Sequence, residues 1–270
     1  MNKKAWCGIL SVIIAALCIL SFSACKKERE DGGGEDFAPL TIGSDDYAPY
    51  FYRDENGEFA GIDVELAAEA CRRIGRKAEF RMIEWSEKDI ILGKGEVECL
   101  WGSFSMTGRE NLYAWAGPYM KSRQVIAVKS DGGIKTFADL AGKSVAVQAT
   151  SKPDEIFSKG EDARFSDIGH IYCFTNTEHI FAALKNGYAD AIAGHEVALR
   201  ERMKNSTGAY RILDETLMSV DLGVAFKKDK DEELAALVGT ALRVMKNDGF
   251  TAKVLKKYGL DPDKLLAVGV

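Results

Sequence analysis

The alternation of strand-like and helix-like segments constrains the fold of this chain more than any other feature of its sequence. Leu66, Ala70 and Ile74 recur at helical spacing, in a segment that begins near Asp63 and ends at Gly75. Short apolar segments on either side have the character of strands. The predicted strands here are 40–43, 78–82 and 97–101, and the predicted helices are 63–75 and 86–93. Repeated strand–helix–strand order predicts a doubly wound α/β sheet.

The same pattern restarts in the middle of the chain. The extended apolar run 124–129 is followed by a short turn of helix at 137–140. The further predicted strands are 144–147, 171–174 and 189–194, and the further predicted helices begin near residues 153, 178 and 196. A second α/β lobe explains this repetition most simply.

After a strand at 222–226, the last long helix returns to the first lobe in our interpretation, because no third lobe exists for it to join. Its apolar positions follow helical spacing and are Leu234, Leu237, Val238, Ala241, Leu242 and Met245. The chain would then cross between the lobes twice, near 124–129 and near 219–226. We therefore expect lobe 1 to comprise residues 38–124 and 223–270, lobe 2 to comprise 125–222, and a two-strand hinge to lie beside an interlobe ligand cleft.

The N-terminus has the layout of a secretory signal over residues 1–24. Lys3 and Lys4 precede an almost wholly apolar segment, 9–20, whose dozen or so residues fall short of the ~20 that a membrane-spanning helix needs. The small residues before Cys25 resemble a bacterial lipobox, which implies cleavage before Cys25 and a diacylglyceryl group on its sulfur. Residues 25–37 contain three consecutive glycines and many charges, so we expect a flexible linker that tethers the protein without embedding it.

Charge and cysteine content narrow the class of protein further. The formal net charge of −5 argues against a nucleic-acid-binding protein, which would be expected to carry the opposite sign.

Once the signal and Cys25 are set aside, three cysteines remain: Cys71, Cys99 and Cys173. Their odd number and the lack of a C-x-x-C motif predict small core residues and no disulfide or metal site. No cofactor is expected.

Five stretches together resemble the extracellular solute-binding proteins that deliver polar amino acids to ABC importers. They occur in the family's order with near-family spacing, over nearly the whole mature length. The stretches are "YAPYFYRDENGEFAGIDVELAAEACRRIG", "WGSFSMTGREN" followed by "AGPYMKSRQVIAV", "DLAGKSVAVQATS", "ALKNGYADAIAGHE" and "GVAFKKDKDEELAALVGTALRVMKNDGF". The resemblance implies two Rossmann-like lobes, of the type II periplasmic-binding-protein kind, that close on a ligand.

The chemistry of a free amino acid suggests partners for its carboxylate. Arg109 can hold a carboxylate with two parallel charge-assisted hydrogen bonds, and it stands where the family's carboxylate-binding arginine stands. Ser103 and Ser105 match the small residue and the hydroxyl residue of the family's ligand-binding segment. An alignment without a one-residue gap would instead put Phe104 or Met106 at the hydroxyl position.

A second group of candidates comes from the other lobe. Thr150 and Ser151 precede a helix whose free backbone N–H groups suit a carboxylate, although Ser151 also fits a simple helix cap. The family's ammonium-binding acid stands five residues past the aspartate that matches Asp190, where this chain has His195. Glu196 supplies the charge if the backbone shifts by one residue. Asp190 itself is interpreted as a structural residue at the start of a strand.

Aromatic residues mark the expected side-chain pocket. By resemblance, Tyr47 is the first stacking aromatic and Trp85 the second. Tyr50, Phe51 and Trp101 are close in sequence but are more typical of core residues. Asp45 and Asp46 beside Tyr47 would suit a cationic ligand, although adjacent acids in a loop are usually solvated.

These features predict a lipid-anchored receptor on the outer face of the cell membrane that binds an amino acid and serves an ABC importer, as a monomer and without catalysis. The resemblance leaves two alternatives open. One is a dehydratase of prephenate-like acids on the same fold, with Glu196 or His195 as its general acid. The other is a surface adhesin that keeps the fold as a scaffold.

Overall fold

The first half of the chain forms parallel strands with helices between them. The computed structural model describes residues 39–160, 162–204, 206 and 209–266. Strand β1 pairs in parallel with β4 on one side and with β5 on the other. The elements are β1 (Leu40–Ser44), α2 (Ile62–Arg73), β4 (Ala78–Met82), η1 (Trp85–Glu87), α3 (Lys88–Lys94) and β5 (Cys99–Leu100), with the small hairpin β2 (Tyr52–Arg53) and β3 (Phe59–Ala60). These elements and the C-terminal helices come from the two ends of the described sequence, and together we call them the outer group. The C-terminal helices are α7 (Glu232–Asn247), α8 (Phe250–Lys257) and α9 (Pro262–Leu265).

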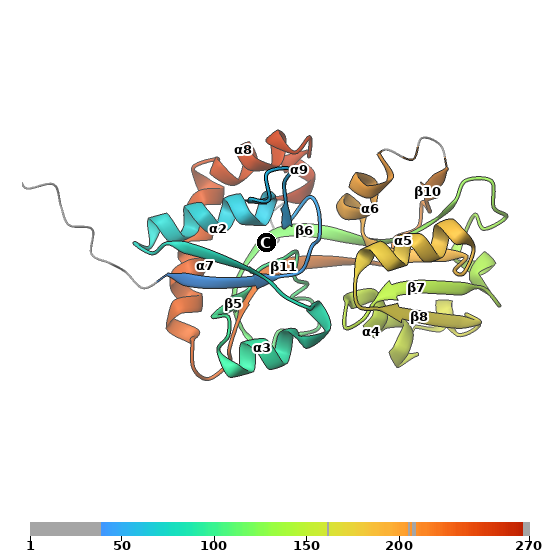
Figure 1. Cartoon of the computed structure of the whole chain (residues 1–270), viewed down its shortest axis with the longest axis horizontal. Coiled ribbons are helices and arrows are strands. Elements are labelled where there is room, and N and C mark those ends of the chain that lie inside the picture. Colours follow the sequence, from blue (N-terminus) through green and yellow to red (C-terminus); the bar gives the residue numbers. More distant parts are fainter. Residues whose placement is uncertain (1–38, 161, 205, 207–208, 267–270) are drawn as a thin grey trace, which may run out of the picture. The chain divides into compact units, whose positions relative to one another are not determined.

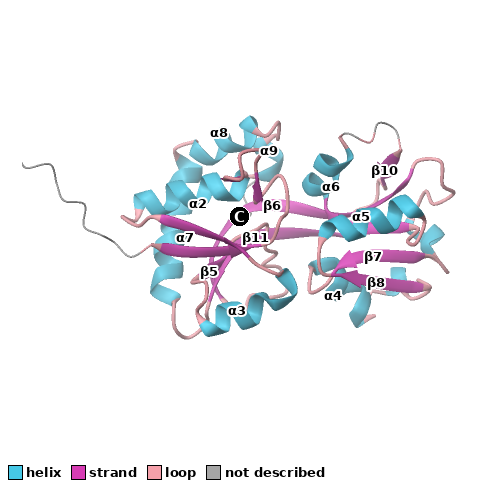
Figure 2. Ribbon diagram, viewed as in Figure 1, coloured by secondary structure: helices cyan, strands magenta, loops and turns pink. Residues whose placement is uncertain are grey.

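The middle of the sequence forms a second set of parallel strands and helices. We call it the central group because of its place in the sequence. Strand β7 pairs in parallel with both β8 and β9. The elements are η2 (Phe137–Leu140), β7 (Ser144–Gln148), α4 (Lys152–Lys159), η3 (Ala163–Phe165), β8 (His170–Phe174), α5 (Thr177–Asn186), β9 (Ala191–His195), α6 (Glu196–Met203) and β10 (Tyr210–Ile212). The predicted α/β class is confirmed (Figure 2).

Two long antiparallel strands, β6 (Ala114–Lys129) and β11 (Met218–Phe226), connect the groups (Figure 1). Strand β11 pairs with β5 of the outer group, and β6 pairs with β9 of the central group, so one sheet has the order β4-β1-β5-β11-β6-β9-β7-β8. These shared strands confirm the predicted architecture of two α/β lobes with a two-strand connection.

Strand β6 begins ten residues earlier than the predicted run at 124–129. Gly117 and Pro118 lie within the part of β6 that precedes the predicted run, and proline lacks the N–H that a strand ladder uses. The structure accommodates them with an irregularity: the register shifts between Leu222 and Val224, so Gly223 lies opposite this segment. A bulge of this kind lets a strand continue through a residue that cannot donate.

The outer and central groups are built mainly around different hydrophobic clusters, and Ala198 of α6 joins the cluster of the outer group. Val238 and Leu242 of α7 share a cluster with Leu40 and Trp101, so the last long helix packs on the outer group. The central group is built around other clusters, which include Val145, Leu140 and Leu184. Cys71 and Cys99 are buried free thiols, as predicted for small core residues, whereas Cys173 on β8 is exposed and that prediction is wrong for it.

Helix α7 departs from its predicted apolar face at one position. Leu237 is 49% exposed, whereas Val238 is wholly buried. We therefore expect Leu237→Gln to change the free energy of unfolding by less than about 0.5 kcal/mol, as is usual for surface positions. Val238→Ala should lower it by about 2 kcal/mol because it leaves a cavity. Urea unfolding of both variants tests this, and an equal loss in both would contradict the assignment of the buried face.

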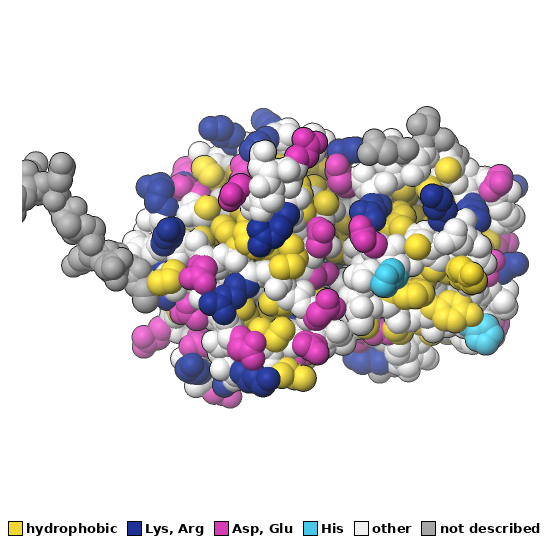
Figure 3. All heavy atoms as spheres, in the orientation of Figure 1, with side chains coloured by type: hydrophobic (Ala, Val, Ile, Leu, Met, Phe, Trp, Pro, Cys, Tyr) yellow, Lys and Arg dark blue, Asp and Glu magenta, His cyan; other side chains and the backbone are white. Residues whose placement is uncertain are grey.

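The predicted signal (1–24), the lipidated Cys25 and the linker (25–37) lie outside the described residues. Within the described part of the chain, no helix combines the length and the apolar character needed to cross a bilayer. Acidic and basic side chains are interspersed on the face drawn in Figure 3, and several acidic ones lie near its middle.

Candidate functional site

A cavity of about 450 Å³ lies between residues of the outer and central groups. Its walls come from segments that follow the carboxyl ends of parallel strands. Tyr47 follows β1, Trp85 follows β4, Ser103 follows β5, Ser151 follows β7 and Asn176 follows β8. Open α/β sheets place ligands at this end of their strands, and the volume is typical of a small-molecule site.

Six of the eight predicted ligand-binding residues line this cavity: Tyr47, Trp85, Ser103, Ser105, Arg109 and Ser151. Thr150 is not among the lining residues, but its hydroxyl donates to the carbonyl of the lining residue Trp85 at 3.4 Å. Glu196 is not among the lining residues. Residues that are far apart in the sequence, and that the sequence suggested as ligand-binding residues, therefore line one cavity.

Arg109 is a buried cation in the lining of this cavity, with a side chain that is 9% exposed. Its guanidinium donates to the carbonyl oxygens of Ser105, at 3.4 Å, and Thr150, at 3.2 Å. It also lies 3.2 Å from the carboxylate of Glu155 and stacks over the ring of Phe104. Burial lowers the pKa of Arg109, and the charge of Glu155 opposes that shift.

Glu155 of α4 is shared by several cations. Besides Arg109, Lys152 lies 3.2 Å from its carboxylate and Lys159 lies 2.6 Å away. Lys152 is nearly buried and lines the cavity beside Arg109. A ligand carboxylate that reaches Arg109 would thus enter an environment in which two lining cations already share one protein carboxylate.

The loop that carries Ser103 is held by a buried acid that the sequence did not reveal as a site residue. Asp63 is wholly buried, and its carboxylate accepts a hydrogen bond of 2.6 Å from the backbone N–H of Ser103. Ser103 has a φ of 46°, a left-handed conformation that is costly for a residue with a side chain. The preceding Gly102 has room for no side chain, since a Cβ there would lie 1.8 Å from Ser44 Oγ. Burial raises the pKa of Asp63 to about 7.

The N-terminus of α4 supplies the wall opposite this loop. Ser151 is the N-cap residue, and its hydroxyl accepts from the backbone N–H of Asp154 at 3.3 Å. Thr150 has a φ of 61°, and its N–H donates to the Asp154 carboxylate. Ser151 is therefore both a helix cap and a cavity residue, which joins the two roles considered for it.

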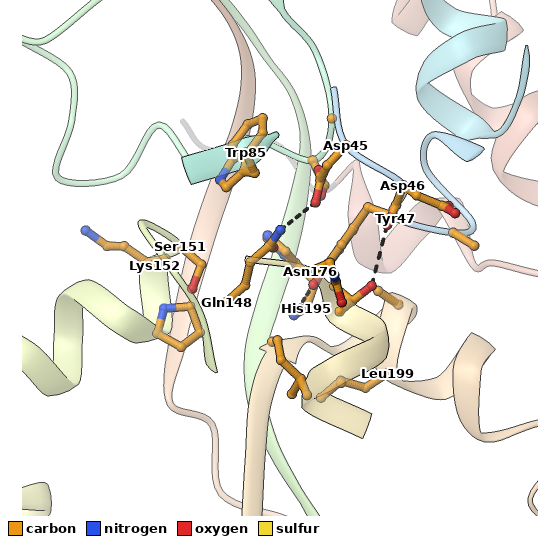
Figure 4. Close-up of a pocket in the computed structure, with 18 of the residues that line it drawn as sticks. Asp45, Asp46, Tyr47, Trp85, Gln148, Ser151, Lys152, Asn176, His195 and Leu199 are labelled. Carbon is orange, nitrogen blue, oxygen red and sulfur yellow. Dashed lines mark hydrogen bonds between the residues drawn. The ribbon is translucent and has the colours of Figure 1, made fainter. Parts of the chain in front are cut away.

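His195 ends β9 and turns its ring into the cavity wall. Its Nδ1 lies 2.9 Å from Ser122 Oγ, and its Nε2 lies 2.9 Å from the side-chain nitrogen of Gln124. The hydroxyl of Tyr47 accepts from the backbone N–H of His195 at 3.3 Å (Figure 4). Burial, reinforced by the charge of Arg109, lowers the pKa of His195 to about 3, so the ring is neutral at physiological pH.

The side chain of Glu196 lies away from the cavity. Its carboxylate is 3.0 Å from Arg123 and 2.7 Å from Arg200, both on the outer surface. The cause is the turn from β9 into α6: His195 is the last strand residue and faces inward, so the next residue starts the helix on the other side. The backbone shift that would bring Glu196 to a ligand ammonium is not present.

Asp45 and Asp46, which the sequence suggested either as partners of a cationic ligand or as solvated loop acids, both line the cavity. The Asp45 carboxylate accepts a hydrogen bond from the side chain of Gln148 (Figure 4). Burial, opposed by that hydrogen bond, raises the pKa of Asp45 to about 6. Burial also raises the pKa of Asp46. The signal available in the sequence was their position directly after β1, at the carboxyl end of a strand.

The remaining candidates have structural roles. Tyr50, Phe51 and Trp101 are wholly buried core residues and do not line the cavity. Asp190 accepts hydrogen bonds of 2.8 Å from both the N–H and the hydroxyl of Ser144, which ties β7 to the start of β9. The structural interpretation of Asp190 is confirmed.

Comparison with known proteins agrees with the resemblance seen in the sequence. Residues 40–261 match the family of bacterial extracellular solute-binding proteins, family 3. The L-cystine-binding protein TcyA of Bacillus subtilis is 26% identical over 275 residues, which cover 97% of this chain and 100% of that protein. An ancestral arginine-binding protein bound to arginine is 28% identical, with a TM-score of 0.74 over 82% of this chain and 97% of that one. An ancestral amino acid-binding protein, a precursor of cyclohexadienyl dehydratase, is also 28% identical, with a TM-score of 0.72 over 82% of this chain and 95% of that one.

Proposed function

Because this chain belongs to the bacterial extracellular solute-binding proteins of family 3, we propose that it binds an amino acid in the cavity and delivers it to an ABC importer. The observation that carries this proposal is the buried guanidinium of Arg109 in the cavity wall. A carboxylate loses its hydration on entering such a site and must receive charged partners in return. Arg109 provides two parallel donors, and Lys152 adds positive charge beside it.

In the proposed mechanism, the ligand first meets the lobe comprising residues 38–124 and 223–270. Ser103, Ser105 and Arg109 receive its carboxylate end there, while Tyr47 and Trp85 form the walls around its side chain. The lobe of residues 125–222 then rotates about β6 and β11 and brings the N-terminus of α4, with Thr150 and Ser151, onto the ligand. Closure changes the outer surface, which the membrane subunits of the importer would recognise.

We further propose that the protein works as a monomer at the outer face of the cell membrane. Cleavage after residue 24 would leave Cys25 as the lipidated N-terminus, and residues 25–37 would act as its tether. In an organism with an outer membrane, the same arrangement would place it in the periplasm. A tether keeps a receptor near the importer that it serves.

The dehydratase alternative is less well supported by the site. Its general acid would have to be His195 or Glu196. The His195 ring is neutral and held between Ser122 and Gln124, and the Glu196 carboxylate is bound to Arg123 and Arg200 outside the cavity. Neither group is placed to donate a proton to a ligand, so we propose a binding protein without catalysis.

A thermal-shift screen tests the proposal. The chain would be melted with each of the twenty amino acids, with cystine and with several organic acids. Ligand at about a hundredfold excess over Kd should stabilise the folded state by ~2.7 kcal/mol, which raises Tm measurably. Stabilisation by one class of amino acids is expected. Stabilisation only by a prephenate-like acid would favour the enzyme, and no stabilisation by any small molecule would favour the adhesin.

A further inference from the structure

The carboxylate of Glu155 already holds the guanidinium that the proposed function gives to a ligand. Arg109 lies in the segment between β5 and β6, and Glu155 lies in the first turn of α4. The two side chains form an ion pair in which Nη2 of Arg109 is 3.2 Å from Oε2 of Glu155. A ligand carboxylate on Arg109 would therefore have to share this cation with a carboxylate of the protein.

A second buried cation contacts the same carboxylate oxygen. The ammonium of Lys152 lies 3.2 Å from Oε2 of Glu155, and its side chain is 6% exposed. Lys152 and Arg109 both line the cavity, whereas Glu155 itself is not among the lining residues. One oxygen of Glu155 thus carries the counter-charge for two cations that face a ligand.

The position of the guanidinium does not depend on Glu155. Arg109 donates from Nη1 to the carbonyl of Ser105 and from Nη2 to the carbonyl of Thr150. Its Cζ also lies 5.3 Å from the centre of the Phe104 ring. These contacts do not involve the charge of Glu155, so we expect them to remain when that charge is removed.

Glu155 carries a full negative charge at neutral pH. Burial raises the pKa of its carboxyl group, but the hydrogen bonds of Lys159 and Lys152 and the charge of Arg109 outweigh burial and lower this pKa below its ordinary value. A ligand carboxylate that approaches Arg109 therefore meets a second negative charge beside its binding partner. Like charges repel, and the repulsion is stronger where water is excluded.

Glu155 can release Arg109 without losing every partner of its own charge. Its other oxygen, Oε1, lies 2.6 Å from Lys159. Both residues line a second cavity, of about 360 Å³, into which the carboxylate can turn. Asp162 lines this second cavity too, but its carboxylate is bound to Arg164 at 2.6 Å.

We propose that Glu155 is an internal competitor of the ligand carboxylate, which binds Arg109 and Lys152 in exchange with the ligand and lowers the affinity of the cavity. This proposal rests on the proposed function, because it concerns the same cavity and the same arginine. A receptor must release its cargo to the importer. A protein carboxylate that takes back Arg109 favours that release.

Glu155→Gln tests the competition, because it removes the charge and keeps the shape of the side chain. The full chain, purified in detergent, would be titrated calorimetrically with the twenty L-amino acids and L-cystine. The amino acid that binds wild type most tightly would then be compared with the amide that replaces its α-carboxylate. We expect Glu155→Gln to bind this amino acid about tenfold tighter than wild type does. The amide should gain less than about threefold.

The sign of the change separates competition from a positioning role. If Glu155 only oriented Arg109, its neutralisation would weaken binding of the amino acid. Glu232→Gln is the matched control, because it removes an exposed carboxylate from the first turn of α7. It should bind the amino acid like wild type.

The outcomes distinguish this proposal from the proposed function. Equal or weaker binding of the amino acid by Glu155→Gln would overturn the competition and leave an amino-acid receptor. An equal gain for the amide, or an equal gain in Glu232→Gln, would also overturn it, because the effect would then not act between the two carboxylates. If neither wild type nor Glu155→Gln bound any of these amino acids, the competition and the proposed function would both be overturned.

Discussion

Arg109→Ala is expected to lower the affinity for the ligand by about a hundredfold or more. Truncating one partner of a buried, hydrogen-bonded charge pair usually costs 2–5 kcal/mol, because the other charge is left buried without its partner. Here the ligand carboxylate would keep Lys152 and the neutral donors of Ser103, Ser105, Thr150 and Ser151. Isothermal titration of wild type and variant with the tightest ligand from the thermal-shift screen measures the difference.

Two further variants show whether the effect comes from the guanidinium itself. Arg109→Lys keeps a positive charge but not the two parallel donors, so its affinity should lie between those of wild type and Arg109→Ala. Arg243→Ala removes an exposed arginine of α7, far from the lining residues, and should bind like wild type. Binding by Arg109→Ala within about threefold of wild type would contradict the role of Arg109.

As pH rises from about 4 to 7, the free energy of unfolding of the wild type should fall by about 4 kcal/mol relative to that of Asp63→Asn. Burial raises the pKa of Asp63 to about 7 in the folded chain, whereas an aspartate in an unfolded chain titrates near 3.9. Between these values the folded state retains a proton that the unfolded state has lost. The free energy of unfolding therefore falls as pH rises from about 4 to 7, by up to ~1.4 kcal/mol per pH unit.

Asparagine removes this titration while its side-chain oxygen can still accept from the N–H of Ser103. The wild type should therefore lose stability relative to Asp63→Asn as pH rises through this interval. Chemical unfolding at several pH values from about 4 to 8 measures the difference, with Leu237→Gln as a surface variant that changes no titratable group. Parallel curves for wild type and Asp63→Asn would show that Asp63 does not hold a proton in the folded state.

Local periodicity was enough to predict most elements of the fold. The spacing of Leu66, Ala70 and Ile74 identified α2, and the apolar run at 144–147 identified β7 almost to its ends. The predicted ends of strands and helices were wrong where the local sequence pattern and the tertiary pairing of strands disagreed. The first half of β6 was not predicted. It contains Gly117 and Pro118, and the strand continues through them because the pairing opposite Gly223 is irregular.

The location of the site was predictable where the sequence resembles the family's ligand-binding segments and less so where the direction of a side chain depends on a turn. Arg109 and Ser105 were proposed from that resemblance and Ser151 from its place before a helix, and all three line the cavity. Glu196 was expected in the cavity, but β9 ends at His195. The side chain of His195 therefore faces the cavity and that of Glu196 does not. The contact of Asp63 with Ser103 joins residues 40 positions apart and leaves no local signal in the sequence.

The measurement that tests our central proposal most directly is a crystal structure of the protein with its tightest ligand from the thermal-shift screen. We predict that the ligand occupies the cavity and that its carboxylate oxygens accept hydrogen bonds from the guanidinium of Arg109. A ligand bound outside the cavity, or one whose carboxylate lies away from Arg109, would contradict the proposal.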